Sequence, residues 1–136
     1  DSPYMLMVSN INNNKTIEMN EEQKKLFGID KLNIKRSEIP AVTHVDYSAR
    51  IQTVHKETNE KYFKLIQKFK EKTNCPVVVN TSFNVRGEPI VNTPLDAFNC
   101  FMGTKLDKLI IGNCYLKKNN QDSSLKKNYA KEFDLD

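Results

Sequence analysis

Three successive valines, Val77 to Val79, form the feature that most limits how this chain can fold. They follow Pro76 and end at Asn80. Continuous β-branched runs of this kind are typical of central strands that are buried on both faces of a sheet. The run therefore predicts a strand at residues 76–80 in the interior of a sheet.

Two helices are predicted beside this strand. In residues 59–72 the large apolar side chains recur on one face, lysines cover the other face, and Asn59 serves as the cap. A second helix begins at Pro94, with Thr93 as its cap and Asp96 completing a capping box, and it ends at Gly103. Both helices bring an apolar face that the sheet can cover.

Other short apolar segments predict further strands. These are a buried strand at residues 4–8, a strand at 41–45, a half-buried strand at 50–55 and a buried strand at 109–112 that extends through 116. The order strand, helix, strand, helix, strand over residues 49–116 predicts the α/β class, as a sandwich with a substantially central sheet.

The remaining segments are polar. Residues 9–38 are expected to form a surface insert or lid, with a short helix at 21–27 that Asn20 caps and Gly28 ends. Residues 117–136 are expected to form a polar C-terminal tail with one frayed helix around 124–133. We therefore expect one domain over residues 1–116, followed by this tail.

Length and composition set the size of the core and exclude an integral membrane protein. With 136 residues and 38% apolar side chains the chain can bury one core, and no apolar run is long enough to cross a bilayer. The three cysteines are odd in number and lack C-x-x-C spacing, which favours a reducing, cytoplasmic compartment and buried thiols over catalytic ones. Because the chain begins with Asp1 rather than Met and opens into an apolar run at residues 4–8, we expect it to be a piece of a longer protein.

The loop N-T-S-F-N-V-R-G-E-P, residues 80–89, carries the most chemical information. Ligands in open α/β sheets bind outside the carboxyl ends of strands, where this loop is expected. Neutral donors are offered by Asn80, Thr81, Ser82 and Asn84, and Gly87 allows a close backbone approach or a positive φ. Arg86, one of only three arginines among 21 basic residues, offers a planar cation. The inventory suits a phosphate or carboxylate pocket, and it equally suits a hydrogen-bonded structural turn.

A second segment, T-H-V-D-Y-S-A-R at residues 43–50, offers other candidates. His44 and Asp46 would share one face of a strand, which allows a metal site, although a hydrogen bond that orients a turn is favoured. Arg50 could point into the same pocket as Arg86, and two guanidiniums would suit a polyanion in phosphoryl chemistry. Glu88 could act as a base or pair with Arg86, and it is not nominated as catalytic.

Three stretches resemble a known family. They are S-P-Y-M-L-M-V, then I-P-A-V-T-H-V-D-Y-S-A-R-I-Q-T-V, and P-V-V-V-N-T-S-F-N-V-R-G-E-P-I-V-N-T-P-L-D-A-F-N-C-F followed by L-I-I-G-N. Together they resemble the C-terminal region of the O-carbamoyltransferases that modify nodulation factors and antibiotics. The resemblance covers roughly residues 2–116 and is weak over 9–38.

The resemblance implies a partial YrdC-like fold, as a twisted open mixed sheet with flanking helices, and an enzymatic role. Members of the family use ATP, with Mg²⁺, and carbamoyl phosphate to form carbamoyl adenylate, which passes to a hydroxyl acceptor on an N-terminal domain that carries the metal site. It implies phosphate or nucleotide contacts for Arg50, Asn80, Ser82 and Arg86, and Asn84 of the same loop is included with them. Gly usually follows H-V-D in the family, and Tyr47 stands there in this chain.

The resemblance also implies partners. The N-terminal domain and part of the YrdC-like region lie outside this chain, so the chain by itself is expected to be inactive or nearly so. The alternative hypothesis is an RNA-binding module of YrdC-like shape, drawn from the net charge of +4 and the lysine-rich helix. Since those lysines alternate with acidic residues, as on a solvated face, we favour the enzyme.

Overall fold

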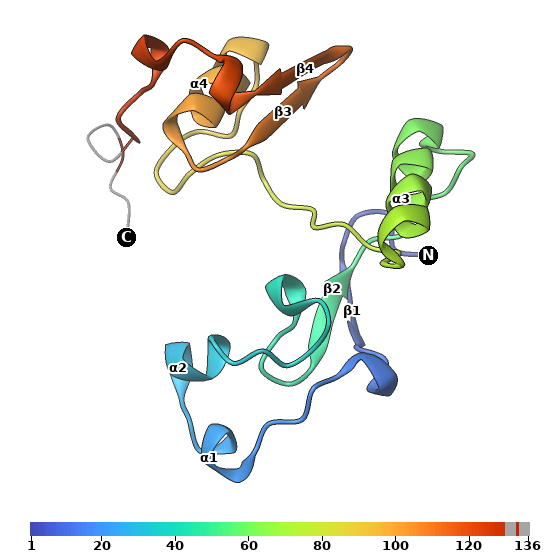
Figure 1. The fold of residues 1–136 in the computed structure, drawn as a ribbon. Helices are drawn as coiled ribbons and strands as arrows, with labels where there is room; N and C mark the ends of the chain where they lie inside the picture. The colour runs from blue at the N-terminus through green and yellow to red at the C-terminus, as the bar shows by residue number, and fades with distance from the viewer. Residues whose placement is uncertain (130–132, 134–136) are drawn as a thin grey trace. The chain divides into compact units, whose positions relative to one another are not determined.

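The computed structural model describes residues 1–129 and residue 133. The chain divides into two compact units, residues 1–79 and residues 80–136. Figure 1 labels the helices and strands of both units. The structure mixes helices and strands, as an α/β chain does, which confirms the predicted class.

The sheet of the first unit has two strands. Strand β1 (Met7–Asn10) pairs antiparallel with β2 (Ser48–Ile51), and the register places Val8 opposite Arg50. All four residues of β1 are exposed. The prediction of a buried strand at residues 4–8 was therefore wrong in both position and burial, because a strand is buried only where another layer covers its side chains.

The strand predicted at residues 41–45 is also wrong. Pro40–Val42 form a 3₁₀-helix, η2, with Pro40 in its first turn. The backbone N–H of Thr43 donates to the carbonyl oxygen of Pro40 at 3.4 Å. Proline fixes its own φ near the value that such a turn requires, so the chain turns where the apolar pattern favoured an extended strand.

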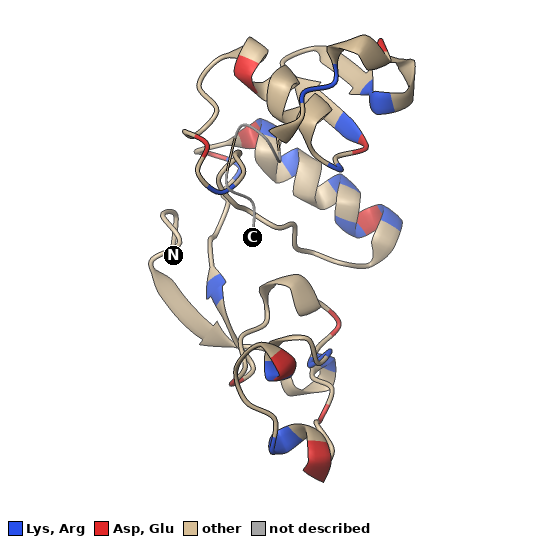
Figure 2. Ribbon diagram, turned by 90° about the vertical axis from the view of Figure 1, so that its left-hand side faces the viewer, with Lys and Arg blue, Asp and Glu red and all other residues tan. Residues whose placement is uncertain are grey.

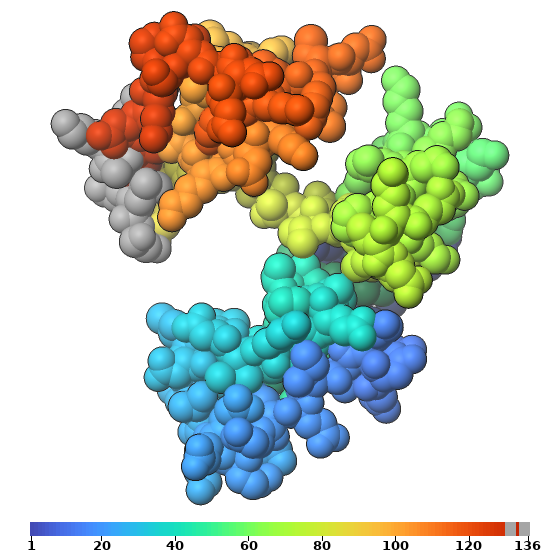
Figure 3. All heavy atoms as spheres, viewed as in Figure 1, coloured from blue at the N-terminus to red at the C-terminus, as the bar shows by residue number. Residues whose placement is uncertain are grey.

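After the end of β1, the helices of the predicted surface insert are all short. They are η1 (Asn13–Lys15), α1 (Glu21–Lys24) and α2 (Gly28–Leu32). Asn20 caps α1 as predicted, in a capping box with Gln23, but Gly28 begins α2 with a φ of +58° and does not end the first helix. None of residues 20–35 is buried, and Figure 3 shows this segment in light blue on the outside of the first unit.

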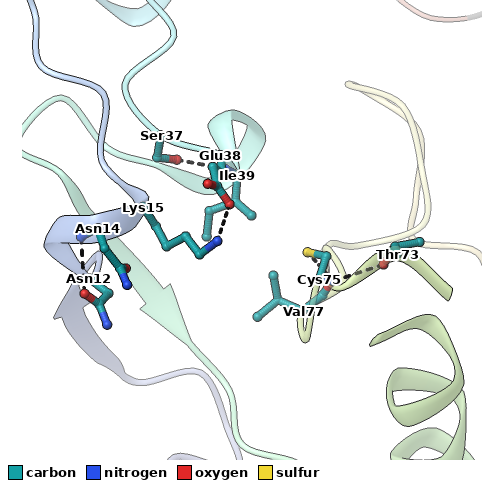
Figure 4. Close-up of polar contacts among 9 residues, drawn as sticks. All are labelled: Asn12, Asn14, Lys15, Ser37, Glu38, Ile39, Thr73, Cys75 and Val77. Atoms are coloured by element: carbon teal, nitrogen blue, oxygen red, sulfur yellow. Dashed lines mark hydrogen bonds and ion pairs between the residues drawn. The ribbon is translucent and has the colours of Figure 1, made fainter. Parts of the chain in front are cut away.

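The two ends of this insert lie side by side. Thr16 and Ser37 form an isolated antiparallel bridge, and the Lys15 ammonium pairs with the Glu38 carboxylate at 2.7 Å. Figure 4 shows this ion pair beside Ser37, whose hydroxyl accepts the backbone N–H of Ile39 at 2.9 Å. The insert is therefore closed at its base by backbone and side-chain contacts together.

Helix α3 (Glu60–Thr73) confirms the predicted helix. The side chain of Asn59 accepts the backbone N–H of Tyr62 at 3.2 Å, and Asn74 ends the helix in the left-handed conformation. A groove of about 400 Å³ lies against its apolar face. The groove is lined by Gln52, Val54, Phe63, Ile66, Gln67, Lys70 and Pro76.

Residues 76–80 do not form a strand. Val77 is 43% exposed and Val79 is 58% exposed, so the predicted central strand was wrong. Figure 4 shows the backbone leaving α3 here, with the N–H of Cys75 donating to the Thr73 hydroxyl at 3.1 Å. A strand needs a neighbour to take its backbone hydrogen bonds, and β-branched residues alone do not supply one.

The second unit has its own apolar core. Helix α4 (Pro94–Gly103) has the predicted capping box, in which Thr93 accepts the N–H of Asp96 and the Asp96 carboxylate accepts the N–H of Thr93. The helix packs on a hairpin of β3 (Lys108–Ile111) and β4 (Cys114–Lys117). The buried members of this core are Ala97, Phe101, Met102 and Leu109.

The strand predicted from 109 through 116 is therefore two strands. Gly112 adopts a φ of +55° between them, which reverses the chain. The tail continues as two 3₁₀-helices, η3 (Lys118–Asn120) and η4 (Ser123–Leu125). The helix predicted at 124–133 includes residues 130–132, which lie outside the described residues.

Within the described residues the strands form two small antiparallel sheets, where a single twisted open sheet was predicted. No helix among them is long and apolar enough to cross a membrane.

Candidate functional site

The informative loop contains a tight turn at residues 85–88. The backbone N–H of Glu88 donates to the carbonyl oxygen of Val85 at 3.1 Å, and Gly87 has a φ of +79°. A positive φ at the third position is typical of a type II turn and is the reason that glycine stands there. Arg86 occupies the second position of the turn, and its side chain is exposed.

Side chains on both sides hold this turn. The Asn84 amide nitrogen donates to the carbonyl oxygens of Val85 at 3.2 Å and of Glu88 at 2.9 Å. The Glu88 carboxylate accepts the backbone N–H of Val85 at 2.9 Å. An amide nitrogen has two hydrogens, so Asn84 gives both to the loop in this conformation. Asn84 and Glu88 thus shape the turn that presents Arg86.

The loop is fixed to the core at its base. Phe83 and Val91 pack against the buried cluster of the second unit, and the N–H of Val91 donates to the carbonyl oxygen of Phe83 at 2.9 Å. Asn80 and Ser82 precede this anchor and are exposed. The structure therefore brings the four candidate residues of the loop onto one anchored, surface-accessible segment.

The fifth candidate, Arg50, belongs to the first unit. It lies on β2 with an exposed side chain, and its Nη2 donates to the carbonyl oxygen of Met5 at 2.7 Å. This bond fixes the guanidinium beside the chain segment that leads into β1. The convergence of Arg50 and Arg86 on one ligand stays a prediction.

The His44 and Asp46 pair forms a turn through a residue that sequence reasoning missed, Ser48. The Ser48 hydroxyl donates to Asp46 Oδ1 at 2.7 Å and lies 2.9 Å from His44 Nδ1. Because a hydroxyl has one proton, His44 Nδ1 must be the donor to Ser48. Hydrogen bonds from the Ser48 side chain and backbone lower the pKa of Asp46 below its ordinary value. This geometry agrees with the interpretation that was favoured for His44 and Asp46, in which hydrogen bonding orients a turn.

No cluster of three or more His, Cys, Asp or Glu side chains that could hold a metal ion lies among the described residues.

Tyr47 lies within the turn at residues 44–48. This residue has a φ of +66°, and its hydroxyl accepts the backbone N–H of Met19 at 3.1 Å. A left-handed backbone favours glycine, so Tyr47 occupies a conformation that is costly for it.

The third arginine, Arg36, has a structural role. Its side chain is 2% exposed, and its guanidinium donates to backbone carbonyl oxygens on both sides of the turn that follows the insert. These acceptors belong to Lys31, Leu32, Ile34, Thr43 and His44. All three guanidinium nitrogens donate to backbone oxygens, and together with the burial of the side chain this leaves Arg36 unsuited to binding an anion.

Cys100 is a buried residue of α4 that interacts with Glu88 of the loop. Burial raises the pKa of its thiol to about 11, and the charge of Glu88 together with a hydrogen bond to it acts in the same direction. A thiol with a raised pKa is a poor nucleophile. Cys100 therefore fits the predicted role of a buried thiol, and none of the three cysteines forms a disulfide.

The lysines of α3 lie among acidic residues. Lys64 pairs with Glu60 at 2.8 Å, and Lys68 pairs with Glu71 at 2.6 Å. Figure 2 shows both signs of charge along this long helix. This mixture is typical of a solvated helix surface and lacks the continuous basic stripe of a nucleic-acid interface.

Comparisons with known proteins place this loop in a family context. Residues 1–118 match the family described as Carbamoyltransferase C-terminus. An uncharacterised protein of Synechocystis is 53% identical over 136 residues, which are 99% of this chain and 22% of that protein. The nodulation protein NolNO of Sinorhizobium fredii is 45% identical over 84 residues, 62% of this chain and 12% of that protein.

A relative from antibiotic synthesis also matches. The 3'-hydroxymethylcephem-O-carbamoyltransferase of Amycolatopsis lactamdurans is 32% identical over 82 residues, 60% of this chain and 16% of the enzyme. The matched segments thus span between about an eighth and a fifth of the lengths of these relatives. The match over residues 1–118 includes both the His44–Arg50 segment and the loop at 80–89, and it shows that the chain belongs to the carbamoyltransferase C-terminus family.

Proposed function

We propose that this chain is the part of an O-carbamoyltransferase that binds ATP and carbamoyl phosphate and forms carbamoyl adenylate. The observation that carries the proposal is the anchored turn at residues 85–88, which holds Arg86 exposed at its tip. Family membership and the names of the relatives NolNO and cephem O-carbamoyltransferase support the class of reaction. The alternative of an RNA-binding module has no comparable observation in its favour.

The residue types in the loop suit phosphate. A guanidinium can give two parallel hydrogen bonds to one phosphate group, which an ammonium cannot. Ser82 and Asn80 add neutral donors from the segment just before the turn. Asn84 acts by holding the turn with both of its amide hydrogens. Arg50 is a separate candidate for a phosphate contact on the first unit.

The leaving groups of the proposed reaction explain why the site needs positively charged donors. By mass balance, carbamoyl phosphate, ATP and water give carbamoyl adenylate, phosphate and diphosphate. Two phosphate-containing leaving groups depart, and positively charged donors stabilise the negative charge that develops on them. We propose that Mg²⁺ enters with ATP, because Mg²⁺ is commonly bound by phosphate oxygens and water with few protein ligands.

The carbamoyl group then passes to a hydroxyl acceptor on another part of the same polypeptide. Large apolar side chains at the start of the first unit support a docking role, since Tyr4 is 79% exposed and Leu6 is 80% exposed. Exposed apolar patches often mark interaction sites. We propose that the N-terminal domain of the same protein covers these side chains. We also propose that the protein works in the reducing cytoplasm, where three free cysteines are stable.

The test uses the full-length protein with Arg86→Ala and Arg86→Lys. We expect diphosphate release, dependent on ATP and carbamoyl phosphate, to fall at least 100-fold in Arg86→Ala. Arg86→Lys should recover only a small part of it, because the planar fork is lost. Lys105→Ala, which removes an exposed cation outside the loop in the same unit, is the matched control and should retain activity.

Unchanged turnover in Arg86→Ala would overturn the proposal for this loop. A parallel measurement of RNA binding at two salt concentrations tests the alternative. Binding through phosphate contacts weakens steeply as salt is added, so RNA affinity without that dependence rejects an electrostatic RNA-binding module.

A further inference from the structure

The tail beyond the family match reaches the loop that carries Arg86. The match ends at residue 118, and Tyr129 lies eleven residues further along the chain. Tyr129 is 3% exposed, and its hydroxyl donates to Glu88 Oε1 at 2.7 Å. The other oxygen of the same carboxylate accepts the backbone N–H of Val85. Glu88 therefore connects a buried side chain of the tail to the backbone of the turn.

One glycine, Gly103, makes room for this part of the tail, and a second, Gly87, lies beside it. A Cβ atom at Gly103 would lie 1.5 Å from Cδ2 of the Tyr129 ring, so the end of α4 accepts the ring only because residue 103 has no side chain. A Cβ at Gly87 would lie 3.8 Å from Cβ of Phe133. The rings of Tyr129 and Phe133 are stacked, with centroids 5.1 Å apart. The tail thus packs on both the core helix and the turn.

We infer that Tyr129 is a positioning residue, which fixes the orientation of the Arg86 turn through Glu88. The inference rests on the proposed function, in which Arg86 binds a phosphate group. Without the Tyr129 hydroxyl, Glu88 Oε1 loses this donor, and the carboxylate can then turn away from the Val85 N–H. The turn then loses one of the contacts that hold it, while Arg86 itself is unchanged.

The geometry separates this role from simple support of the core. The hydroxyl group of Tyr129 is all that Tyr129→Phe removes, so the stacked ring and the packing on Gly103 remain. Gly103→Ala perturbs the same contact from the opposite side, because the added methyl group collides with the ring. Neither residue belongs to the candidate phosphate contacts. Two independent changes therefore act on one hydrogen bond.

The experiment measures steady-state kinetics and hydrogen exchange on the full-length protein. Arg86→Ala first identifies whether the KM for ATP or for carbamoyl phosphate depends on the turn. Tyr129→Phe and Gly103→Ala should raise that same KM about fivefold to tenfold and leave the other KM and kcat within twofold, as the loss of one hydrogen bond to a charged group predicts. Amide exchange in a peptide spanning residues 83–91 should become faster.

Tyr115→Phe is the matched control, since Tyr115 is exposed in β4 and its substitution should leave both KM values and the exchange unchanged. If Arg86→Ala impairs activity while Tyr129→Phe and Gly103→Ala leave KM and exchange unaltered, the inference is wrong and the proposed function stands. If Arg86→Ala has no effect, the proposed function fails, and unaltered exchange in Tyr129→Phe would then reject the positioning of the turn as well.

Discussion

The guanidinium of Arg36 donates through Nη2 to the carbonyl oxygen of Thr43 at 3.0 Å, inside the protein. The same group binds carbonyl oxygens that precede Arg36 in the sequence, among them that of Ile34 at 2.9 Å. Arg36 therefore ties the returning end of the insert to the turn that leads into β2. A buried charge is tolerated here because backbone oxygens surround it.

The first prediction concerns the stability that Arg36 provides. Arg36→Ala should lower the free energy of unfolding by about 3 kcal/mol, since it removes the donor from the buried carbonyl oxygen of Thr43 and from the partly buried contacts with Ile34 and His44. Urea denaturation of the chain measures the loss. Lys35→Ala, at the exposed neighbouring position, should change the value by less than about 0.5 kcal/mol. Equal effects of the two substitutions would contradict the structural role.

Tyr47 gives a prediction about backbone strain. Its φ of +66° is costly for a residue with a Cβ atom, so Tyr47→Gly should be more stable than Tyr47→Ala by about 1 kcal/mol. Both variants lose the ring and the acceptor of the Met19 N–H, so the comparison isolates the backbone. Denaturant midpoints of the two variants provide the measurement. An alanine variant as stable as the glycine variant would rule out strain at this turn.

The capping box of α4 predicts a dependence on pH. Hydrogen bonds from the side chain and backbone of Thr93 lower the pKa of Asp96 below its ordinary value of 3.8. A depressed pKa contributes stability above the unfolded value, and that contribution is lost as the pH falls through the folded value. Thr93→Ala should cost about 1 kcal/mol at pH 7.

The loss of unfolding free energy caused by Thr93→Ala should become smaller below pH 4, because the Asp96 carboxylate of the capping box becomes protonated. Denaturation of wild type, Thr93→Ala and Asp96→Asn at pH 7 and pH 3 measures the change. If the difference between wild type and Thr93→Ala were the same at both pH values, the link between the two side chains would be refuted.

The cysteines should differ in reactivity. Burial raises the pKa of Cys100 to about 11, whereas Cys114 is exposed. Because the thiolate is the reactive form, iodoacetamide at pH 8 should alkylate Cys114 in the folded protein and leave Cys100 unmodified. Mass spectrometry of the peptides, with and without urea, distinguishes the two sites. Native-state labelling of Cys100 as fast as that of Cys114 would be incompatible with its burial.

Leu6 tests whether the exposed apolar start of the first unit is covered in the whole protein. In the 136-residue chain Leu6→Glu should be close to neutral, since the side chain is 80% exposed. In the full-length protein it should cost about 2 kcal/mol or more, because a charge would then be buried against the N-terminal domain. Thermal unfolding of the two proteins makes the comparison. A neutral effect in both would argue against docking at this surface.

Local interactions explain which elements could be predicted from the sequence. Helix α3 begins at its cap Asn59, and helix α4 begins at the Thr93–Asp96 capping box, because these hydrogen bonds form within a few residues of chain. The loop at 80–89 was predicted for a similar reason, since Gly87 supplies the positive φ of its turn. The same loop motif pointed to the family that residues 1–118 match.

Tertiary structure decided the strands and the roles of individual side chains. The valines at 77–79 and the apolar residues at 41–45 lack the partner strand that an extended chain needs, and no local pattern reveals whether a partner exists. The burial of Arg36, the Ser48 bridge between His44 and Asp46, and the reach of Tyr129 to Glu88 depend on chain segments that folding brings together. The sequence alone determined helices α3 and α4, their caps and the turn of the loop, because those depend on near neighbours, while contacts across long stretches of chain required the fold.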